Sequence, residues 1–239
     1  MTEPTSARPD GRRPPVDVAG AIREAVLRGE YVPGQRLIEA ELSAEYGASR
    51  SVVRTALQEL ATEGLIELQR HRGARVRRVS LAEAIEITEV RRVVEGLIAA
   101  KAAERATPEQ IAGLRRVGET MRQAAEHLDA LEYSQLNARL HELVREAAGH
   151  RTAASIIERL RGQIVRHQFR LAFQPGRPAL SLSQHQKIIE AIANRDPAAA
   201  AAAMHEHLDD VLRALRRLDR ADDGSGPRAV AADRPVADG

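Results

Sequence analysis

The chain has 239 residues, which allows one large domain or two of moderate size. With 36 Lys and Arg against 34 Asp and Glu, its formal net charge of +2 is far below that of chains that coat nucleic acid non-specifically. Cysteine is absent, which excludes disulfides, thiolate catalysis and cysteine-ligated metal sites. No continuous apolar run approaches the roughly 18 residues that a membrane span needs. Residues 1–15 lack the apolar stretch of a signal peptide. We therefore expect a soluble, cytoplasmic protein.

Hydrophobic residues make up 43% of the chain, yet it has only three Tyr, two Phe and no Trp. A core of Ala, Leu, Ile and Val favours packed helices over sheets, so we expect a mainly α protein. Residues 1–15 and 221–239 show no apolar periodicity and are expected to be disordered. Between them, residues 16–79 hold short segments separated by Gly and Pro, whereas residues 80–220 hold long helical patterns. The pattern predicts two domains.

The first domain has the element order of a winged helix-turn-helix. Apolar residues at helical spacing predict three short helices, with Gly47 and Ser49 as the cap residues between the second and the third. Leu42 and Tyr46 of the second helix are expected to be buried. Two short apolar runs then flank a basic turn and predict a hairpin. The expected elements are helices at about 18–28, 39–46 and 50–63 and strands at about 65–68 and 74–77.

The third helix carries the candidate DNA-reading residues. Arg50 and Arg54 are four apart, so both project from one face near the helix start, opposite the apolar stripe. A recognition helix enters the major groove by its N-terminal residues, and an arginine there can bind O6 and N7 of one guanine. Ser49, Ser51 and Thr55 are short donors suited to phosphate. The alternative is a solvated helix face with two unremarkable arginines.

The turn between the two expected strands is also basic. Residues 69–78 contain five Arg and one His and no acidic residue, and Gly73 lies where a tight hairpin needs a positive φ. A basic hairpin can straddle the DNA backbone or enter the minor groove, which makes Arg70, His71, Arg72 and Gly73 candidate contacts. A solvated hairpin is possible, but two basic features on one small domain favour DNA binding.

These segments resemble the DNA-binding domain of the GntR family of bacterial transcription regulators. The likeness runs through residues 18–78 in order and includes IREAVLRGEYVPGQRL, SRSVVRTALQEL, EGLI and RGARV. The resemblance implies that Arg50 and Arg54 contact operator bases or phosphates and that Gly73 lies at the tip of the wing.

Two other positions follow from the same resemblance. Arg36, within the PGQRL motif, is implied as a further phosphate contact. Some members of the family carry another arginine early in the second helix, where this chain has Glu-Ala-Glu at residues 39–41. The base preference of those members therefore does not transfer to this chain.

The second domain is expected to be an antiparallel helical bundle. Ser80 suits a helix N-cap, and later breaks fall at residues 107–108, 149, 175–178 and 196–197. Each apolar stripe needs a partner, so six or seven helices should pack into one bundle. The expected helices span about 81–105, 108–127, 129–148, 151–173, 180–194 and 197–220.

Three of the eight histidines lie on apolar helix faces and suggest a metal site. His141 follows Asn137 by one helical turn, while His185 and His207 belong to two other helices. Imidazoles from three helices of a bundle can converge on one cation, and with an amide oxygen they suit Zn²⁺ or Ni²⁺ better than Ca²⁺ or Mg²⁺. Such histidines are more often hydrogen-bonded core residues, and spacing does not separate His207 from His205.

The second domain resembles the FCD effector domain of the FadR subgroup of GntR regulators. The likeness covers about residues 81–218 and includes the segments EVRRVVE and AAMHEHL. In that domain an Asp or Asn, a His four residues later and two more His bind a divalent metal inside the ligand cavity. The resemblance implies Asn137, His141, His185 and His207 as ligands, the last because it precedes Leu in the Met-Xaa-Xaa-His-Leu pattern.

Asn137 replaces the Asp that is commoner at this position of the domain. A neutral amide should lower the metal affinity somewhat and leave the cavity more electropositive toward an anion. Arg91, which faces inward with Val94 and Ile98, is a candidate second anchor because a guanidinium grips a carboxylate in a fork. An i,i+4 pair with Glu95 is the alternative, and both arrangements can hold.

The resemblance implies a metabolite-responsive regulator that binds a palindromic operator as a symmetric homodimer. We expect a repressor that leaves its operator when a small carboxylate binds. The carboxylate would act by binding the DNA-competent and DNA-incompetent arrangements of the protein with different affinity. One alternative is a DNA-binding regulator without an effector, whose histidine cluster is a purely structural metal site. A metal-dependent hydrolase is a remote alternative, since we expect no carboxylate beside the three histidines to act as general base. We expect no enzymatic activity.

Overall fold

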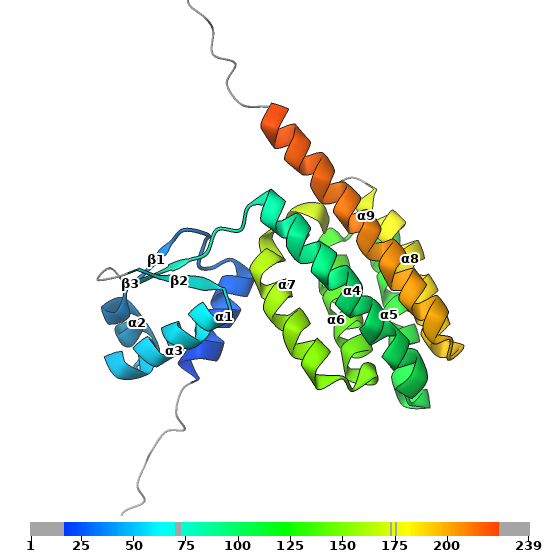
Figure 1. The fold of residues 1–239 in the computed structure, drawn as a ribbon, viewed down its shortest axis with the longest axis horizontal. Coiled ribbons are helices and arrows are strands. Elements are labelled where there is room, and N and C mark those ends of the chain that lie inside the picture. The colour runs from blue at the N-terminus through cyan, green and yellow to red at the C-terminus, as the bar shows by residue number, and fades with distance from the viewer. Residues whose placement is uncertain (1–16, 70–72, 173, 175, 225–239) are drawn as a thin grey trace, which may run out of the picture. The chain divides into compact units, whose positions relative to one another are not determined.

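A computed structural model describes residues 17–69, 73–172, 174 and 176–224 of the chain (Figure 1). The chain divides into two compact units. The first holds the described residues up to Arg78 together with Arg161–Val165, and the second holds Val79–Leu160 and the residues from Arg166 onward. The termini that we expect to be disordered lie largely outside the described residues. The last helix continues to Gly224, four residues beyond the end that we expected near residue 220.

The first unit is the expected winged helix-turn-helix. Asp17 caps its first helix by accepting a hydrogen bond from the Gly20 amide (2.8 Å), and Gly29 ends that helix in the left-handed conformation. Apolar side chains from the three helices and the sheet form one buried core. Tyr46, which we expected inside, is only half-buried, and its hydroxyl lies 3.0 Å from that of Tyr31. The elements are α1 (Val18–Arg28), β1 (Arg36–Leu37), α2 (Glu39–Tyr46), α3 (Arg50–Thr62), β2 (Ile66–Gln69) and β3 (Gly73–Val76).

The sheet has one strand more than the sequence predicted. Its order is β1-β3-β2 and both pairings are antiparallel, with Arg36 opposite Arg75 and Ile66 opposite Val76. We interpreted Leu37 as the approach to the second helix, but its side chain is buried and its strand closes the edge of the wing. A two-residue strand is too short to show the alternation by which strands are recognised.

The second unit is the expected helical bundle, with six helices among the described residues. Thr107 and Gln110 form a capping box at the start of α5. We expected the fifth helix of the bundle to begin near residue 180, but α8 begins at Arg177, because Pro178 lies in its first turn, where a proline is tolerated. The helices are α4 (Leu81–Arg105), α5 (Pro108–Glu126), α6 (Ala130–Ala148), α7 (Arg151–Ala172), α8 (Arg177–Ala193) and α9 (Pro197–Gly224).

Helix α4 organises the bundle. It packs against α6, α8 and α9, and it runs antiparallel beside α9 (Figure 1). The core between the helices is built from Ala, Leu, Ile, Val and Met side chains with Tyr133 as its aromatic member. Inside this layer the structure also buries polar side chains of α4, α6, α8 and α9. Within the described residues, no helix has both the length and the apolar character of a membrane span.

Candidate DNA-reading face and histidine cluster

Helix α3 begins at a capped, basic end. The Ser49 hydroxyl accepts a hydrogen bond from the Val52 amide at 3.4 Å and so caps the helix. The apolar stripe of α3 is buried in the core of the first unit. Arg50 and Arg54 consequently lie on the exposed face, as predicted.

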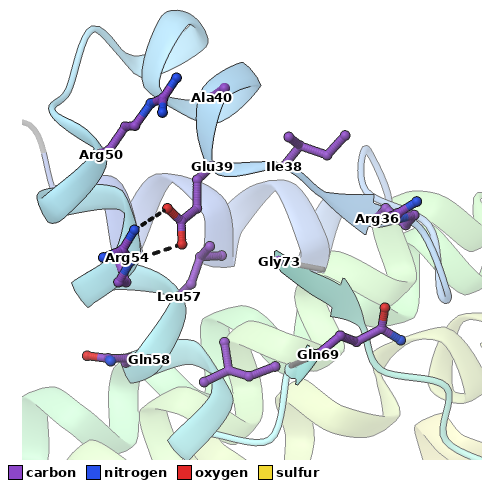
Figure 2. Close-up of a pocket in the computed structure, with 11 residues that line it drawn as sticks. Arg36, Ile38, Glu39, Ala40, Arg50, Arg54, Leu57, Gln58, Gln69 and Gly73 are labelled. Carbon is purple, nitrogen blue, oxygen red and sulfur yellow. Dashed lines mark hydrogen bonds and ion pairs between the residues drawn. The ribbon is translucent and has the colours of Figure 1, made fainter. Parts of the chain in front are cut away.

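The two arginines differ in their partners. Nε and Nη2 of Arg54 donate to the two carboxylate oxygens of Glu39, the first residue of α2, at 3.1 and 2.8 Å (Figure 2). The hydrogen bond from Arg54 lowers the pKa of Glu39, and the charge of Arg50 adds to that shift. Arg50 itself makes no hydrogen bond or ion pair with any residue that the structure describes. Arg50 is thus near Glu39 without being bound to it, whereas the charge of Arg54 is balanced directly by the Glu39 carboxylate.

The hydroxyls that we predicted as phosphate donors have local partners. The hydroxyl of Ser49 lies 2.9 Å from that of Ser51, and Thr55 donates to the Ser51 carbonyl at 3.1 Å. Ser49 therefore stabilises the start of α3 as its N-cap. A contact of Ser49, Ser51 or Thr55 with phosphate stays a prediction.

A groove of about 720 Å³ lies between the start of α2, the outer face of α3 and the sheet (Figure 2). Gly73 on its wall has a φ of +80°, and a β-carbon there would lie 2.9 Å from the Leu37 carbonyl oxygen, so this position requires glycine. Arg70, His71 and Arg72 lie outside the described residues. The charged and polar residues that line the groove are Arg36, Glu39, Arg50, Arg54, Gln58 and Gln69.

Three histidines meet inside the second unit. His141 of α6, His185 of α8 and His207 of α9 are buried, and one ligand atom of each lies within 4.8 Å of the others. Their ring centroids are 4.5 to 5.6 Å apart. His205 instead lies against α4, where a β-carbon on Gly96 would collide with its Nε2. The geometry thus separates His207 from His205, which spacing alone did not.

Hydrogen bonds orient two of these rings. Nδ1 of His141 lies 3.0 Å from a carboxylate oxygen of Glu95, and Nδ1 of His207 lies 3.1 Å from the amide oxygen of Gln184. Both partner atoms are acceptors, so Nδ1 carries a proton in each ring, and in the neutral ring Nε2 carries the lone pair. This tautomer is the one in which Nε2 coordinates a metal.

The third ring and the neighbouring amide hold orphaned acceptors. Nδ1 of His185 faces the hydroxyls of Tyr133 (3.2 Å) and Ser181 (3.4 Å). Among the described residues, Nε2 of His185 and Oδ1 of Asn137 are both buried without a hydrogen-bond partner. Unpaired buried acceptors are costly and rare, and a divalent cation held among the three histidines would satisfy Nε2 of His185. The three histidines therefore fit a divalent metal, and Asn137, one turn before His141 on α6, stays the candidate oxygen ligand; such a set suits Zn²⁺ or Ni²⁺.

The protonation state of two of the three rings suits the same role. Burial lowers the pKa of both His185 and His207 well below the ordinary value of 6.5. The neighbouring imidazoles and the charge of Arg177 lower it further. Neutral imidazole is the form that coordinates metals.

Arg91 and Glu95 connect to this cluster from α4. Arg91 donates from Nε to Glu95 at 2.7 Å, both side chains are about 3% exposed, and the other Glu95 oxygen faces His141. The i,i+4 pair that we weighed is thus present, while Nη1 of Arg91 is buried without a hydrogen-bond partner in the described chain. We expected no carboxylate placed beside the histidines to act as general base, and no local pattern indicated that the bundle brings Glu95 of a separate helix to His141. Since Glu95 is held on both sides, it orients groups rather than serving as a free base.

Comparisons with known proteins decide the family. Residues 15–76 match the family described as bacterial regulatory proteins of the gntR family, and residues 86–210, more than half of the chain, match the FCD domain. A transcriptional regulator in an unstable DNA locus of Streptomyces ambofaciens is 31% identical over 213 residues, which cover 89% of each chain. The chain belongs to the GntR family of transcription regulators.

Other relatives of this GntR regulator agree. The gluconate operon transcriptional repressor of Bacillus licheniformis is 30% identical over 203 residues, 82% of both chains. The solved structure of Escherichia coli McbR/YncC has the same fold, with a TM-score of 0.72 at 22% identity over 84% of this chain and 96% of that chain. These families and relatives are transcription regulators and not enzymes, so we abandon the hydrolase alternative.

Our sequence reasoning missed two residues of the regulator's histidine site. Gln184 orients His207, and its only signal was its place directly before His185. Arg177 was assigned to a loop, but it is buried at the start of α8, pairs with the buried Asp210 of α9 and lowers the pKa of two histidines. No local pattern would have found Arg177, since its partner lies on another helix.

Proposed function

We propose that this regulator represses transcription by binding a palindromic operator as a homodimer, and that a small carboxylate metabolite releases it. Helix α3 and the wing contact the operator, with Arg50 as the principal charged contact. The residues at the histidine cluster hold a divalent metal, and the metabolite binds there. A protein with this role works in the cytoplasm, where the bacterial chromosome lies.

The observation that carries this proposal is the convergence of three buried imidazoles, in a unit where a nearby buried amide oxygen on α6 has no hydrogen-bond partner among the described residues. His141, His185 and His207 come from three helices, and Asn137 lies one turn before His141. When bound, the metal supplies a concentrated positive charge that attracts a carboxylate. Because none of the four proposed ligand groups is a carboxylate, that charge is not cancelled by the ligands themselves.

The buried guanidinium of Arg91 supplies the second contact for an anion. Its Nε is held by Glu95, so the group is fixed in direction, and its Nη1 has hydrogens to donate. The name of the Bacillus licheniformis relative mentions gluconate, a carboxylate. A hydroxy acid of that kind suits a site with a cation, a guanidinium and several hydroxyl and amide groups.

The metabolite acts by binding one arrangement of the regulator more tightly than the other. A ligand with equal affinity for the DNA-binding and the released arrangement would shift nothing. Its site is assembled from α4, α6, α8 and α9, so binding changes how these helices pack. For the metabolite to release the operator, it has to favour the helix packing of the arrangement that does not bind DNA.

The test is a footprint on the DNA upstream of the protein's own gene, with metal-free, Zn²⁺-loaded and Ni²⁺-loaded protein, and with and without gluconate as the first probe acid. We expect a symmetric protected region that a carboxylate weakens only in the metal-loaded protein. His141→Ala should abolish both metal binding and the response, whereas His205→Ala, the matched control, should keep both. A footprint that no member of a panel of small carboxylates alters would contradict the effector part of the proposal.

A second candidate is a purely structural metal site without an effector. The observation in its favour is that Glu95 and Asp210 already balance the two buried arginines beside the cluster. In that case the metal would raise the stability of the second unit, and neither its removal from folded protein nor any added acid would change the operator affinity.

A further inference from the structure

The ion pair between Glu39 and Arg54 lies in the groove that faces DNA in the proposed function. Glu39 begins α2 and Arg54 occupies the second turn of α3, so the pair joins the two helices of the helix-turn-helix (Figure 2). Arg54 is 62% exposed and Glu39 is 28% exposed. A surface ion pair of this kind contributes little to folding stability. Its main effect is therefore expected on the binding of DNA.

The guanidinium hydrogens of Arg54 fall into two groups, those that bind Glu39 and those that are left for another acceptor. Nε and one Nη2 hydrogen are directed at the carboxylate, which occupies one edge of the planar guanidinium. A guanidinium has five N–H donors, so Nη1 and the remaining Nη2 hydrogen form a second edge that points away from Glu39. Two parallel donors on one edge match O6 and N7 of guanine.

The charge of Glu39 decides which partner can use that second edge. A phosphate that approached Arg54 would also approach the carboxylate and be repelled, whereas a guanine edge is neutral. Glu39 stays ionised, because the hydrogen bond from Arg54 lowers its pKa. Arg50 also feels the charge of Glu39 but is not hydrogen-bonded to it, so it keeps more of its attraction for phosphate than Arg54 does.

We propose that Glu39 is a specificity-determining residue: it turns Arg54 from a phosphate contact into a base-reading group. The inference rests on the proposed function, in that it requires the groove to face DNA. It also gives a physical reason for the acidic residue at the start of α2. Without such a role, a negative charge there would only weaken the attraction of this surface to DNA.

The test is selection from a pool of random 20-base-pair duplexes by the full-length protein, followed by sequencing. The variants are Glu39→Gln, Arg54→Ala and Glu39→Asp, with Glu41→Gln as the matched control. Glu41 is exposed on the same helix and makes no hydrogen bond or ion pair with a described residue. Binding of each variant to the wild-type consensus and to a scrambled duplex is then measured over a range of salt concentrations.

We expect Glu39→Gln and Arg54→Ala to lose preference at the same base pair of each half-site, while Glu39→Asp and Glu41→Gln keep it. For Glu39→Gln the ratio of specific to scrambled affinity should fall at least about fivefold, the factor that one good bidentate contact supplies. Its scrambled-duplex binding should become steeper in salt by about one unit of log–log slope, because Arg54 can then neutralise a phosphate.

An unchanged consensus, affinity ratio and salt slope for Glu39→Gln would overturn the inference while leaving the proposed function intact. If the wild-type protein enriched no sequence at all, the proposed DNA contact itself would be overturned. These two failures are therefore distinguishable within one experiment.

Discussion

Glu95 is the residue on which the histidine site depends most, although it is not expected to touch the metal. One of its oxygens accepts from Arg91 and the other faces Nδ1 of His141. A carboxylate behind a metal-binding imidazole fixes the ring and raises its basicity. Through Glu95, a ligand at Arg91 and a metal at His141 would affect one another.

Replacement of Glu95 by Gln should weaken Zn²⁺ binding by about 10- to 100-fold, because His141 would lose its charged partner. The metal-free protein should also lose about 3–5 kcal/mol of stability, since the buried Arg91 would be left without its carboxylate. Competition with a chelator of known affinity measures the first effect and urea unfolding the second. Glu89→Gln on the exposed side of the same helix is the control, and equal Zn²⁺ affinities for the two variants would refute this role.

The lowered pKa values of His185 and His207 predict an acid-sensitive metal-free protein. Above about pH 6.5 both imidazoles are neutral in the folded and the unfolded chain, so their contribution to stability is fully present. Below that pH the unfolded chain takes up protons that the buried rings do not, and stability falls by about 1.4 kcal/mol per pH unit for each ring. Urea unfolding from about pH 7.5 down to about pH 5.5 should show this slope. A variant with both rings replaced by Asn should show a smaller slope, and equal slopes would exclude these histidines as the cause.

Helix positions were largely predictable because their ends carry local signals. Ser80 and Thr107 cap α4 and α5 with their own side chains, and both helices begin where the sequence predicted. The strand at Leu37 was missed since two residues show no periodicity. The start of α8 was missed since Pro178 was interpreted as a break.

Spacing alone predicted site residues only where they lie one helical turn apart, and His185 and His207 followed from the resemblance. Asn137 and His141 followed from spacing and resemblance, as did the shared face of Arg50 and Arg54. Links between elements, such as Glu39 with Arg54 or Glu95 with His141, depend on packing that no local pattern encodes. The choice of His207 over His205 likewise came from the way α9 packs against α4.

At the scale of the wing, Gly73 should tolerate no side chain. Gly73→Ala combines an unfavourable left-handed backbone, about 1–2 kcal/mol, with a collision against the Leu37 carbonyl. Gly47→Ala has a similar φ of +62° and nothing within 4 Å, so it isolates the backbone cost. Urea unfolding should show a greater loss for Gly73→Ala, and DNA affinity should fall with it. Equal losses of unfolding free energy in the two variants would mean that the close approach of the Leu37 carbonyl to Gly73 does not affect stability.

The two compact units of the molecule should respond differently to metal. All of the proposed ligands belong to the second unit, so Zn²⁺ should raise amide-exchange protection in α6, α8 and α9 in proportion to the logarithm of its concentration. The interior amides of α1 and α3 should show a much smaller change. Hydrogen-exchange mass spectrometry with and without Zn²⁺ measures both, and protection confined to the first unit would contradict the site.

The most direct test of the central claim, that helix α3 reads DNA, is the affinity of Arg50→Ala for the duplex that the wild-type protein enriches. Arg50 is exposed on the outer face of α3 and is the proposed phosphate contact, so its loss should weaken binding at least about fivefold and reduce the salt slope by about one unit. Arg28→Ala removes an exposed arginine from the end of α1 and should bind almost as the wild type does. Equal affinities for Arg50→Ala and the wild-type protein, at every salt concentration, would contradict the account.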